Sequence, residues 1–189
     1  YLIEVVPLEN EKSIAIIRYG ANPKVMVADS DGTVLETIKL DRNPLSVVSG
    51  KEFLFITYGE GFFVLTKIDT TSGVKNDIPL PQDAGKIASF DEKTLAIAGS
   101  SEDVIMLVEK ETGLIISTSK TPFITYFLKT IPGKPIMYGA NYFEKSLFVY
   151  DGKKVRTIPL NVYPIALAET GGRAAALGHA GFVEVIDLV

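Results

Sequence analysis

"PIMYGANYFEKSLFVYDGKKVRTIPL", residues 135–160, contains the three features that decide the fold of this chain. One apolar run ends in glycine at Gly139, a second ends in the acidic turn Asp151-Gly152, and a third ends in "TIPL" at Leu160. Asp-Gly followed by two lysines resembles a phosphate or metal loop when it is read alone. Within a repeat it is predicted to be a hairpin turn, in which Asp accepts a backbone hydrogen bond and Gly takes a positive φ.

The glycine-ended run occurs five times, and successive copies end 39 or 40 residues apart. The copies are "IAIIRYG", "LFITYG", "TLAIAG", "PIMYG" and "AAALG", ending at Gly20, Gly59, Gly99, Gly139 and Gly178. An acidic residue closes the run that follows each of them, at Asp29, Asp69, Glu109, Asp151 and Asp187. The chain is therefore built from five copies of one unit.

Each unit consists of four short runs rich in Val, Ile, Phe and Tyr, divided by Gly, Pro, Asn and Asp, and no helical apolar stripe is present. Four strands in about 40 residues are typical of a β-propeller blade. We therefore predict an all-β single domain over 1–189, a β-propeller of about five four-stranded blades whose last blade is incomplete. The predicted repeats are 1–42, 43–82, 83–121, 122–161 and 162–189.

The strand order within a blade also follows from the runs. The "PLSVV" run is predicted to be innermost and the "TIPL" run outermost, because an edge strand tolerates the missing amide donor of Pro79 and Pro159. The fifth repeat supplies only three strands. Three interpretations follow: a five-bladed ring with a three-stranded last blade, a ring whose first blade is the short one, or a fragment of a longer chain, which the non-Met first residue Tyr1 favours.

Residues 147–188, "LFVYDGKKVRTIPLNVYPIALAETGGRAAALGHAGFVEVIDL", resemble the surface-layer-type YVTN β-propeller repeats, with "xVxVIDxxTGxVxxTIPVG" and "DGKxxYVxN" patterns. "VLTKIDTTSGVKNDIPL", residues 64–80, follows the first pattern in part, whereas "IRYG", "ITYG", "MYGAN" and "ALGHA" replace the Tyr-Val-Thr-Asn tetrad. The chain has no Trp, unlike Trp-Asp and quinone-cofactor repeats. The resemblance implies a secreted or cell-surface architectural role, with a cytoplasmic location as the alternative.

The composition excludes several classes of function. The net charge is −4 and no basic cluster exceeds Lys153-Lys154, which argues against nucleic-acid binding. Zero Cys and a single His exclude thiolate metal sites, ordinary zinc sites and haem held by paired histidines. No apolar run approaches the roughly 20 residues that cross a bilayer. One Gln and no Cys fit a thermophile.

Six residues are predicted to contact a ligand or partner. Tyr19, Tyr58 and Tyr138 precede the repeat glycine in three units and would lie at one height in a ring, with packing between blades as the alternative. Arg18 and Asn141 would accompany them, and His179 follows the glycine of the fifth unit.

No cofactor, metal or catalytic residue is predicted. "DSDGT", residues 29–33, imitates a calcium loop but lacks a late bidentate carboxylate, so a hairpin is favoured. The predicted function is a non-catalytic binding or scaffold module for a protein partner or larger assembly, completed through strand addition at the incomplete blade. The alternative is a propeller hydrolase that uses calcium or channel carboxylates such as Asp83 and Glu169.

Overall fold

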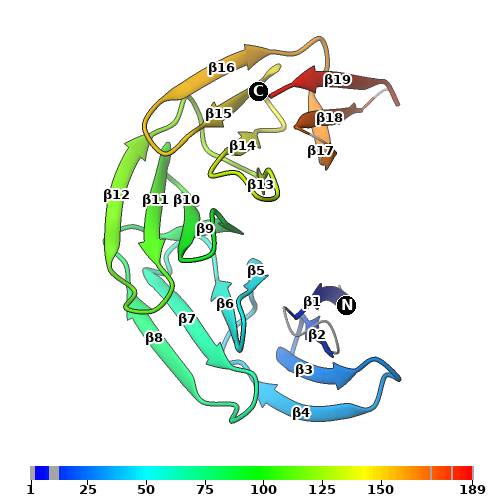
Figure 1. Cartoon of the computed structure of the whole chain (residues 1–189), viewed down its shortest axis with the longest axis vertical. Coiled ribbons are helices and arrows are strands. Elements are labelled where there is room, and N and C mark those ends of the chain that lie inside the picture. Colours follow the sequence, from blue (N-terminus) through cyan, green and yellow to red (C-terminus); the bar gives the residue numbers. More distant parts are fainter. Residues whose placement is uncertain (1–2, 9–12, 171, 180, 189) are drawn as a thin grey trace. The chain divides into compact units, whose positions relative to one another are not determined.

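The computed structural model describes residues 3–8, 13–170, 172–179 and 181–188. The regular secondary structure within these ranges consists of β-strands (Figure 1). The chain divides into two compact units, Tyr1–Ile87 and Ala88–Val189. In the described ranges no helix is long and apolar enough to cross a membrane.

Unit 1 contains two four-stranded antiparallel sheets, with strand orders β1-β2-β3-β4 and β5-β6-β7-β8. Their strands are β1 (Ile3–Pro7), β2 (Ser13–Arg18), β3 (Lys24–Asp29), β4 (Val34–Lys39), β5 (Ser46–Ser49), β6 (Phe53–Thr57), β7 (Val64–Asp69) and β8 (Lys75–Pro79). In both sheets each strand pairs with the next one in the chain, and the first strands β1 and β5 contact each other.

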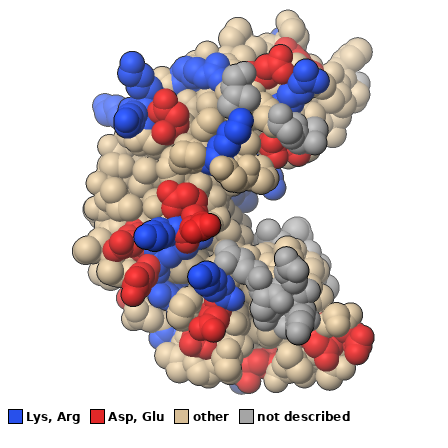
Figure 2. Space-filling view, in the orientation of Figure 1, with Lys and Arg blue, Asp and Glu red and all other residues tan. Residues whose placement is uncertain are grey.

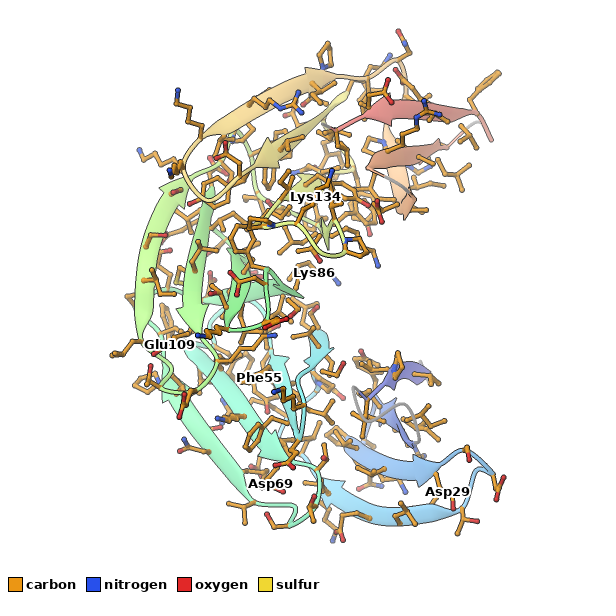
Figure 3. All side chains as sticks on the ribbon, in the orientation of Figure 1. Asp29, Phe55, Asp69, Lys86, Glu109 and Lys134 are labelled. Carbon is orange, nitrogen blue, oxygen red and sulfur yellow. The ribbon has the colours of Figure 1, made fainter. Side chains whose placement is uncertain are left out.

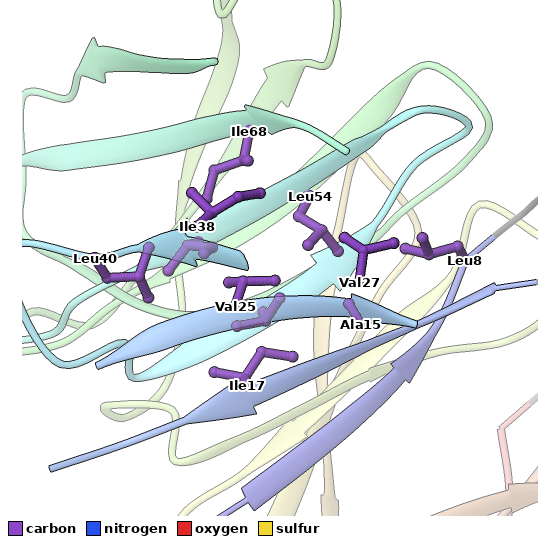
Figure 4. Close-up of a cluster of buried hydrophobic side chains, with 11 residues drawn as sticks. Leu8, Ala15, Ile17, Val25, Val27, Ile38, Leu40, Leu54 and Ile68 are labelled. Carbon is purple, nitrogen blue, oxygen red and sulfur yellow. The ribbon is translucent and has the colours of Figure 1, made fainter. Parts of the chain in front are cut away.

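The two sheets of unit 1 share one hydrophobic core (Figure 4). Ala15 and Ile17 of β2, together with Val25 of β3, pack in one cluster with Leu54 and Ile56 of β6. Alternate residues of a strand point to the same face of its sheet. Ala15 and Ile17 of β2, like Leu54 and Ile56 of β6, are spaced in this way, so each sheet turns an apolar face toward the other. Burial of these side chains holds the two sheets face to face.

Unit 2 begins within β9, the first strand of a sheet with strand order β12-β11-β10-β9. A four-stranded sheet β13-β14-β15-β16 and a three-stranded sheet β17-β18-β19 follow. The strands are β9 (Ala84–Ser89), β10 (Thr94–Gly99), β11 (Val104–Glu109), β12 (Ile115–Lys120), β13 (Phe127–Thr130), β14 (Met137–Ala140), β15 (Ser146–Tyr150), β16 (Val155–Pro159), β17 (Pro164–Thr170), β18 (Arg173–Gly178) and β19 (Val183–Asp187).

In the sheet β13-β14-β15-β16 the middle strands β14 and β15 are buried on both faces. Met137 of β14 and Phe148 of β15 pack in a cluster with Ile105 of β11, whereas Tyr138 and Leu147 pack in a second cluster with residues of β17 and β18. Middle strands covered on both sides need apolar residues at every position. This explains why "LFVY" (147–150) is a continuous apolar run and does not alternate.

The predicted architecture is confirmed. The described residues form nineteen strands, four in each of the first four sheets and three in the last. The "TIPL"-type runs form the fourth strands, which lie at the sheet edges and are largely exposed, so Pro79 and Pro159 occupy edge strands as expected.

The acidic turns are hairpins between the third and fourth strands. Asp29, Asp69 and Asp151 each accept, at Oδ1, two backbone N–H groups from two to four residues further on, at 2.8–3.0 Å. Figure 3 shows Asp29 and Asp69 at these turns. Both "DSDGT" and the turn at Asp151 are thus held by internal hydrogen bonds, and Gly32 and Gly152 have positive φ there.

Candidate functional site

Antiparallel strands give every blade two distinct ends. The loop end carries the connection between the second and third strands and the connection that leaves the fourth strand. The hairpin end carries the connection between the first and second strands and the acidic hairpin. The definition depends only on strand order within each sheet, so it applies to both units.

Exposed aromatic side chains occur only at the loop ends in the described part of the chain. The connections between strands at the hairpin ends contain only one aromatic residue, Phe90, which is buried. The exposed aromatic residues are Phe62, Phe63, Tyr142, Phe143, Tyr163 and Phe182. The exposed rings thus lie at the loop ends of the second, fourth and fifth sheets, and exposed apolar groups of this kind are a feature of interaction surfaces.

In unit 2 two of these exposed residues, Tyr142 and Phe143, pack with Tyr126 and Phe127. The four side chains are called the aromatic cluster. The ring centres of Phe127 and Tyr142 are 4.7 Å apart, those of Tyr126 and Tyr142 5.1 Å, and those of Tyr126 and Phe143 6.5 Å. Phe143 is the most exposed of the chain's large hydrophobic residues described, at 75%. The cluster presents packed rings whose outer faces remain in water.

Asn141 lies beneath the aromatic cluster. Its side chain is 7% exposed, its Nδ2 donates to the carbonyl of Ile124 at 2.8 Å, and its Oδ1 accepts the N–H of Phe143 at 2.8 Å. The amide therefore ties together the two loops that carry the rings. Asn141, predicted as a ligand contact, supports the cluster from below.

Unit 1 contains a polar pocket of about 290 Å³, the Arg42 pocket, which extends from loop-end residues along β7 and β8. It is lined by Asp41, Arg42, Tyr58, Thr66, Lys75 and Asp77. Arg42 lies in the connection that leaves β4, and its Cζ is 5.0 Å from the ring centre of Tyr58 and 5.1 Å from that of Phe62. Each such contact of a cation with a ring contributes about 0.5–1 kcal/mol at an exposed site.

Hydrogen bonds fix the wall of the Arg42 pocket. The hydroxyl of Tyr58 donates to Oγ1 of Thr66 at 2.9 Å, and that oxygen donates to Oδ1 of Asp77 at 2.5 Å. Nζ of Lys75 pairs with Oδ2 of Asp41 at 2.9 Å. Burial raises the pKa of Tyr58, and the hydrogen bond from Lys75 lowers the pKa of Asp41, so the phenol stays neutral and the carboxylate charged near pH 7.

The structure distributes the six predicted contact residues over both units. Tyr19 follows β2, which ends at Arg18, and packs together with Tyr58 against the core of unit 1. In unit 2, His179 is exposed directly after β18, whereas Tyr138 is fully buried. The hydroxyl of Tyr138 has no hydrogen-bond partner among the described residues, and burial, followed by the charge of Glu169, raises its pKa.

The carboxylates of the hydrolase alternative do not define a site. Asp83 is buried in unit 1, whereas Glu169 in unit 2 accepts the N–H of Gly172 at 2.9 Å and so supports a turn. Within the residues that the structure describes, no three or more His, Asp or Glu side chains are grouped closely enough to hold a metal ion.

The sequence analysis did not identify Arg42, Phe62 or the aromatic cluster. For the aromatic residues a signal was present in "GFF" (61–63) and "NYF" (141–143), two aromatic pairs in the connection that follows the repeat glycine, whereas Arg42 had no such signal. A comparison of all five connections, and not only of the position before the glycine, would have found both pairs.

The face drawn in Figure 2 shows acidic and basic side chains interspersed, so charge alone does not distinguish a site there.

Several solved structures resemble this chain. It aligns over 99% of its length with BBS1N, from a crystal structure in complex with ARL6DN, at 14% identity and a TM-score of 0.79. It aligns over 98% with BamB from Moraxella catarrhalis, at 14% identity and 0.70, and over 97% with the dihydro-heme d1 dehydrogenase NirN, at 10% identity and 0.75. No family model and no curated protein matches the chain.

These likenesses define the class of fold. The chain spans 64%, 61% and 45% of the lengths of the three neighbours, in the order given. Together with the repeated sheets of three or four antiparallel strands, they identify the chain as a β-propeller. At 10–14% identity they establish the fold alone.

Proposed function

We propose that this chain is a non-catalytic binding module that recognises a protein partner through the loop ends of its blades. The observation that carries the proposal is the location of the exposed aromatic side chains, all of which lie at loop ends in the described residues. Each such ring can bury about 150–250 Å² of surface in an interface. Tyr and Phe are enriched in protein interfaces relative to other surfaces.

The aromatic cluster of unit 2 is suited to anchor a partner. Asn141 fixes the loop that carries Tyr142 and Phe143, and Tyr142 packs edge to face against Phe127. A surface whose side chains are already ordered loses less entropy on binding than a mobile one. The neighbour BBS1N was solved in complex with ARL6DN, which gives one example of a similar fold with a protein partner.

The test compares two double variants of the tagged chain in pull-down experiments that identify bound proteins by mass spectrometry. Tyr142→Ser with Phe143→Ser is expected to weaken retention of a specific partner about tenfold or more, because anchor residues carry most of the binding energy. Leu114→Ser with Ile116→Ser removes two equally exposed apolar residues, at 66% and 59%, from the third blade's hairpin and fourth strand. These control substitutions should leave retention unchanged.

The proposal is wrong if the two double variants retain the same proteins to the same extent, or if only the control loses them. Circular dichroism of both variants establishes that the strands are intact. The surface-layer-type resemblance further suggests a secreted or cell-surface setting for this module, which localisation of the tagged protein tests directly.

Strand addition is the second part of the proposal. In the described residues β19 has no partner along its outer edge, and Val183 and Val185 are 61% and 63% exposed. The third strands β11 and β15 are mostly buried by comparison. A further strand, from the same protein or another chain, would pair along β19. A monomer of this chain that shows no association in solution at high concentration would count against it.

A further inference from the structure

The guanidinium of Arg42 has the cation–π contacts of a recognition residue but no hydrogen-bond partner among the described residues, and the adjacent carboxylate of Asp41 attracts its charge. Its Cζ lies over the rings of Tyr58 and Phe62, whose centres are 6.2 Å apart. Among the described residues it makes no hydrogen bond and no ion pair. Lys75 in the same pocket is paired with Asp41, and Arg173 in unit 2 with Asp187.

A guanidinium held against ring faces keeps its N–H donors for another molecule. The five donors of arginine lie in one plane and match the two oxygens of a carboxylate or the oxygens of a phosphate. Contact with Tyr58 and Phe62 restricts the rotamers of Arg42, so less side-chain entropy remains to be lost when an anion binds.

The neighbouring charges favour an anion with a single charge. Lys75 is neutralised by Asp41, and Asp77 contributes a second carboxylate to the lining. The charged side chains of the lining, two cations and two carboxylates, sum to zero. The pocket therefore offers no excess positive charge to offset the larger cost of removing a phosphate, with between one and a half and two negative charges near pH 7, from water. A carboxylate in the pocket would meet the N–H donors of Arg42, and a ligand N–H would meet the acceptor oxygens of Asp77.

The size of the pocket suits a side chain. Its volume of about 290 Å³ lies just below the range of roughly 300–1,000 Å³ for small-molecule sites. We propose that the Arg42 pocket binds an acidic side chain, Asp or Glu, of the protein partner, with its carboxylate on the guanidinium of Arg42. This inference rests on the proposed function, since it names the chemistry of the partner at a pocket of unit 1.

Capped peptides test the inference without knowledge of the partner. The probes are Ac-Gly-Glu-Gly-NH₂, its Gln counterpart and its phosphoserine counterpart, titrated into the isotope-labelled chain at low ionic strength. NMR follows the Nε–H signal of Arg42 and the ring signals of Tyr58. The Glu peptide should shift both in a saturable manner, the Gln peptide should not, and the phosphoserine peptide should bind more weakly than the Glu peptide.

Variants assign the response to Arg42. Arg42→Gln should abolish the shift of the Tyr58 ring, and Arg42→Lys should weaken binding about tenfold, because an ammonium keeps the charge but loses the planar fork. Arg173→Gln, the matched loss of one arginine in unit 2, should leave the titration unchanged. Should Arg42→Gln fail to fold, Phe62→Leu serves in its place, and we expect it to weaken binding by loosening the contact.

The inference is overturned if the Glu peptide leaves Arg42 unshifted, if the phosphoserine peptide binds more tightly, or if the Arg42 and Phe62 variants respond as the unmodified chain does. None of these outcomes decides the proposed function, because that test changes Tyr142 and Phe143 in unit 2. Conversely, the pull-down test could fail while the titration succeeds. The pocket would then bind an acidic group, but the claim that this group belongs to a protein partner would be wrong.

Discussion

At the scale of single residues, the repeat glycine has different physical causes in different copies. Gly20 and Gly59 have positive φ, at 117° and 91°, which side chains other than glycine rarely adopt. Gly139 is required for space, since a Cβ there would lie 2.5 Å from Cε1 of Phe148 and 2.9 Å from Cγ2 of Thr125. A Cβ at Gly99 or Gly178 would also approach another atom to 2.7 Å, so one sequence feature reflects a turn in two copies and close packing in three.

Gly139→Ala should destabilise the protein by about 1–3 kcal/mol, the usual cost of overpacking a filled core. The measurement is the free energy of unfolding in denaturant. Phe148→Leu provides the control in a double-mutant cycle, because a smaller side chain at 148 makes room for the new methyl group. Additive effects of the two substitutions would show that the contact with Phe148 is not the cause.

Asp151 should make the folded chain less stable at acidic pH. Backbone N–H groups of Lys154 and Lys153 lower the pKa of its carboxyl from the ordinary 3.8 in the folded chain. A lowered folded pKa means that the stabilisation is complete above the unfolded value and is lost as the pH falls through the folded value. Asp151→Asn keeps the acceptor oxygen without the charge, so its melting temperature should fall less between pH 5 and about pH 2 than that of the unmodified chain. Equal falls would contradict the assignment.

At the scale of elements, the prolines of the fourth strands lie where they block pairing. The N–H of Leu80 donates to the carbonyl of Phe63, and that of Leu160 to the carbonyl of Lys145. Because successive N–H groups of a strand point to opposite edges, the nitrogens of Pro79 and Pro159 face away from the sheet. Each proline thus removes one donor from an exposed strand edge.

Pro79→Val combined with Pro159→Val should increase self-association. The exchange restores an amide donor at the free edges of β8 and β16, and valine favours strand structure. Light scattering during storage at high concentration measures the effect. The comparison is a variant with Val34→Thr and Leu35→Thr, which changes two exposed residues of β4 and restores no amide donor. This variant should not self-associate more than the unmodified chain.

The sequence was sufficient to predict the strands but not the site. Four strands per repeat follow from apolar runs and turn residues, which act locally along the chain. The Arg42 pocket joins the connection after β4 to β7 and β8, and it depends on which side chains meet once two sheets have packed. Tyr58 was predicted because it precedes a repeat glycine, whereas Arg42 belongs to no repeated position.

At the scale of the whole molecule, burial is graded across each blade. The middle strands β6, β10, β11 and β15 are almost wholly buried, whereas the fourth strands β4, β8, β12 and β16 are mainly exposed. Hydrogen-exchange mass spectrometry or NMR should find the slowest amide exchange in the middle strands and the fastest strand exchange in the fourth strands of both units. Uniform protection across a blade would contradict this gradient.

The separation of loop ends from hairpin ends has a practical consequence. The tight turn at 151–154 lies at the opposite end of its sheet from the rings of Tyr142 and Phe143, and its residues Asp151, Lys153 and Lys154 are exposed. Exposed turns of polar residues accept foreign sequence more readily than strands do. A fluorescent reporter or an epitope inserted there would label the molecule while leaving its aromatic surface accessible, and it would provide a way to watch that surface in living cells.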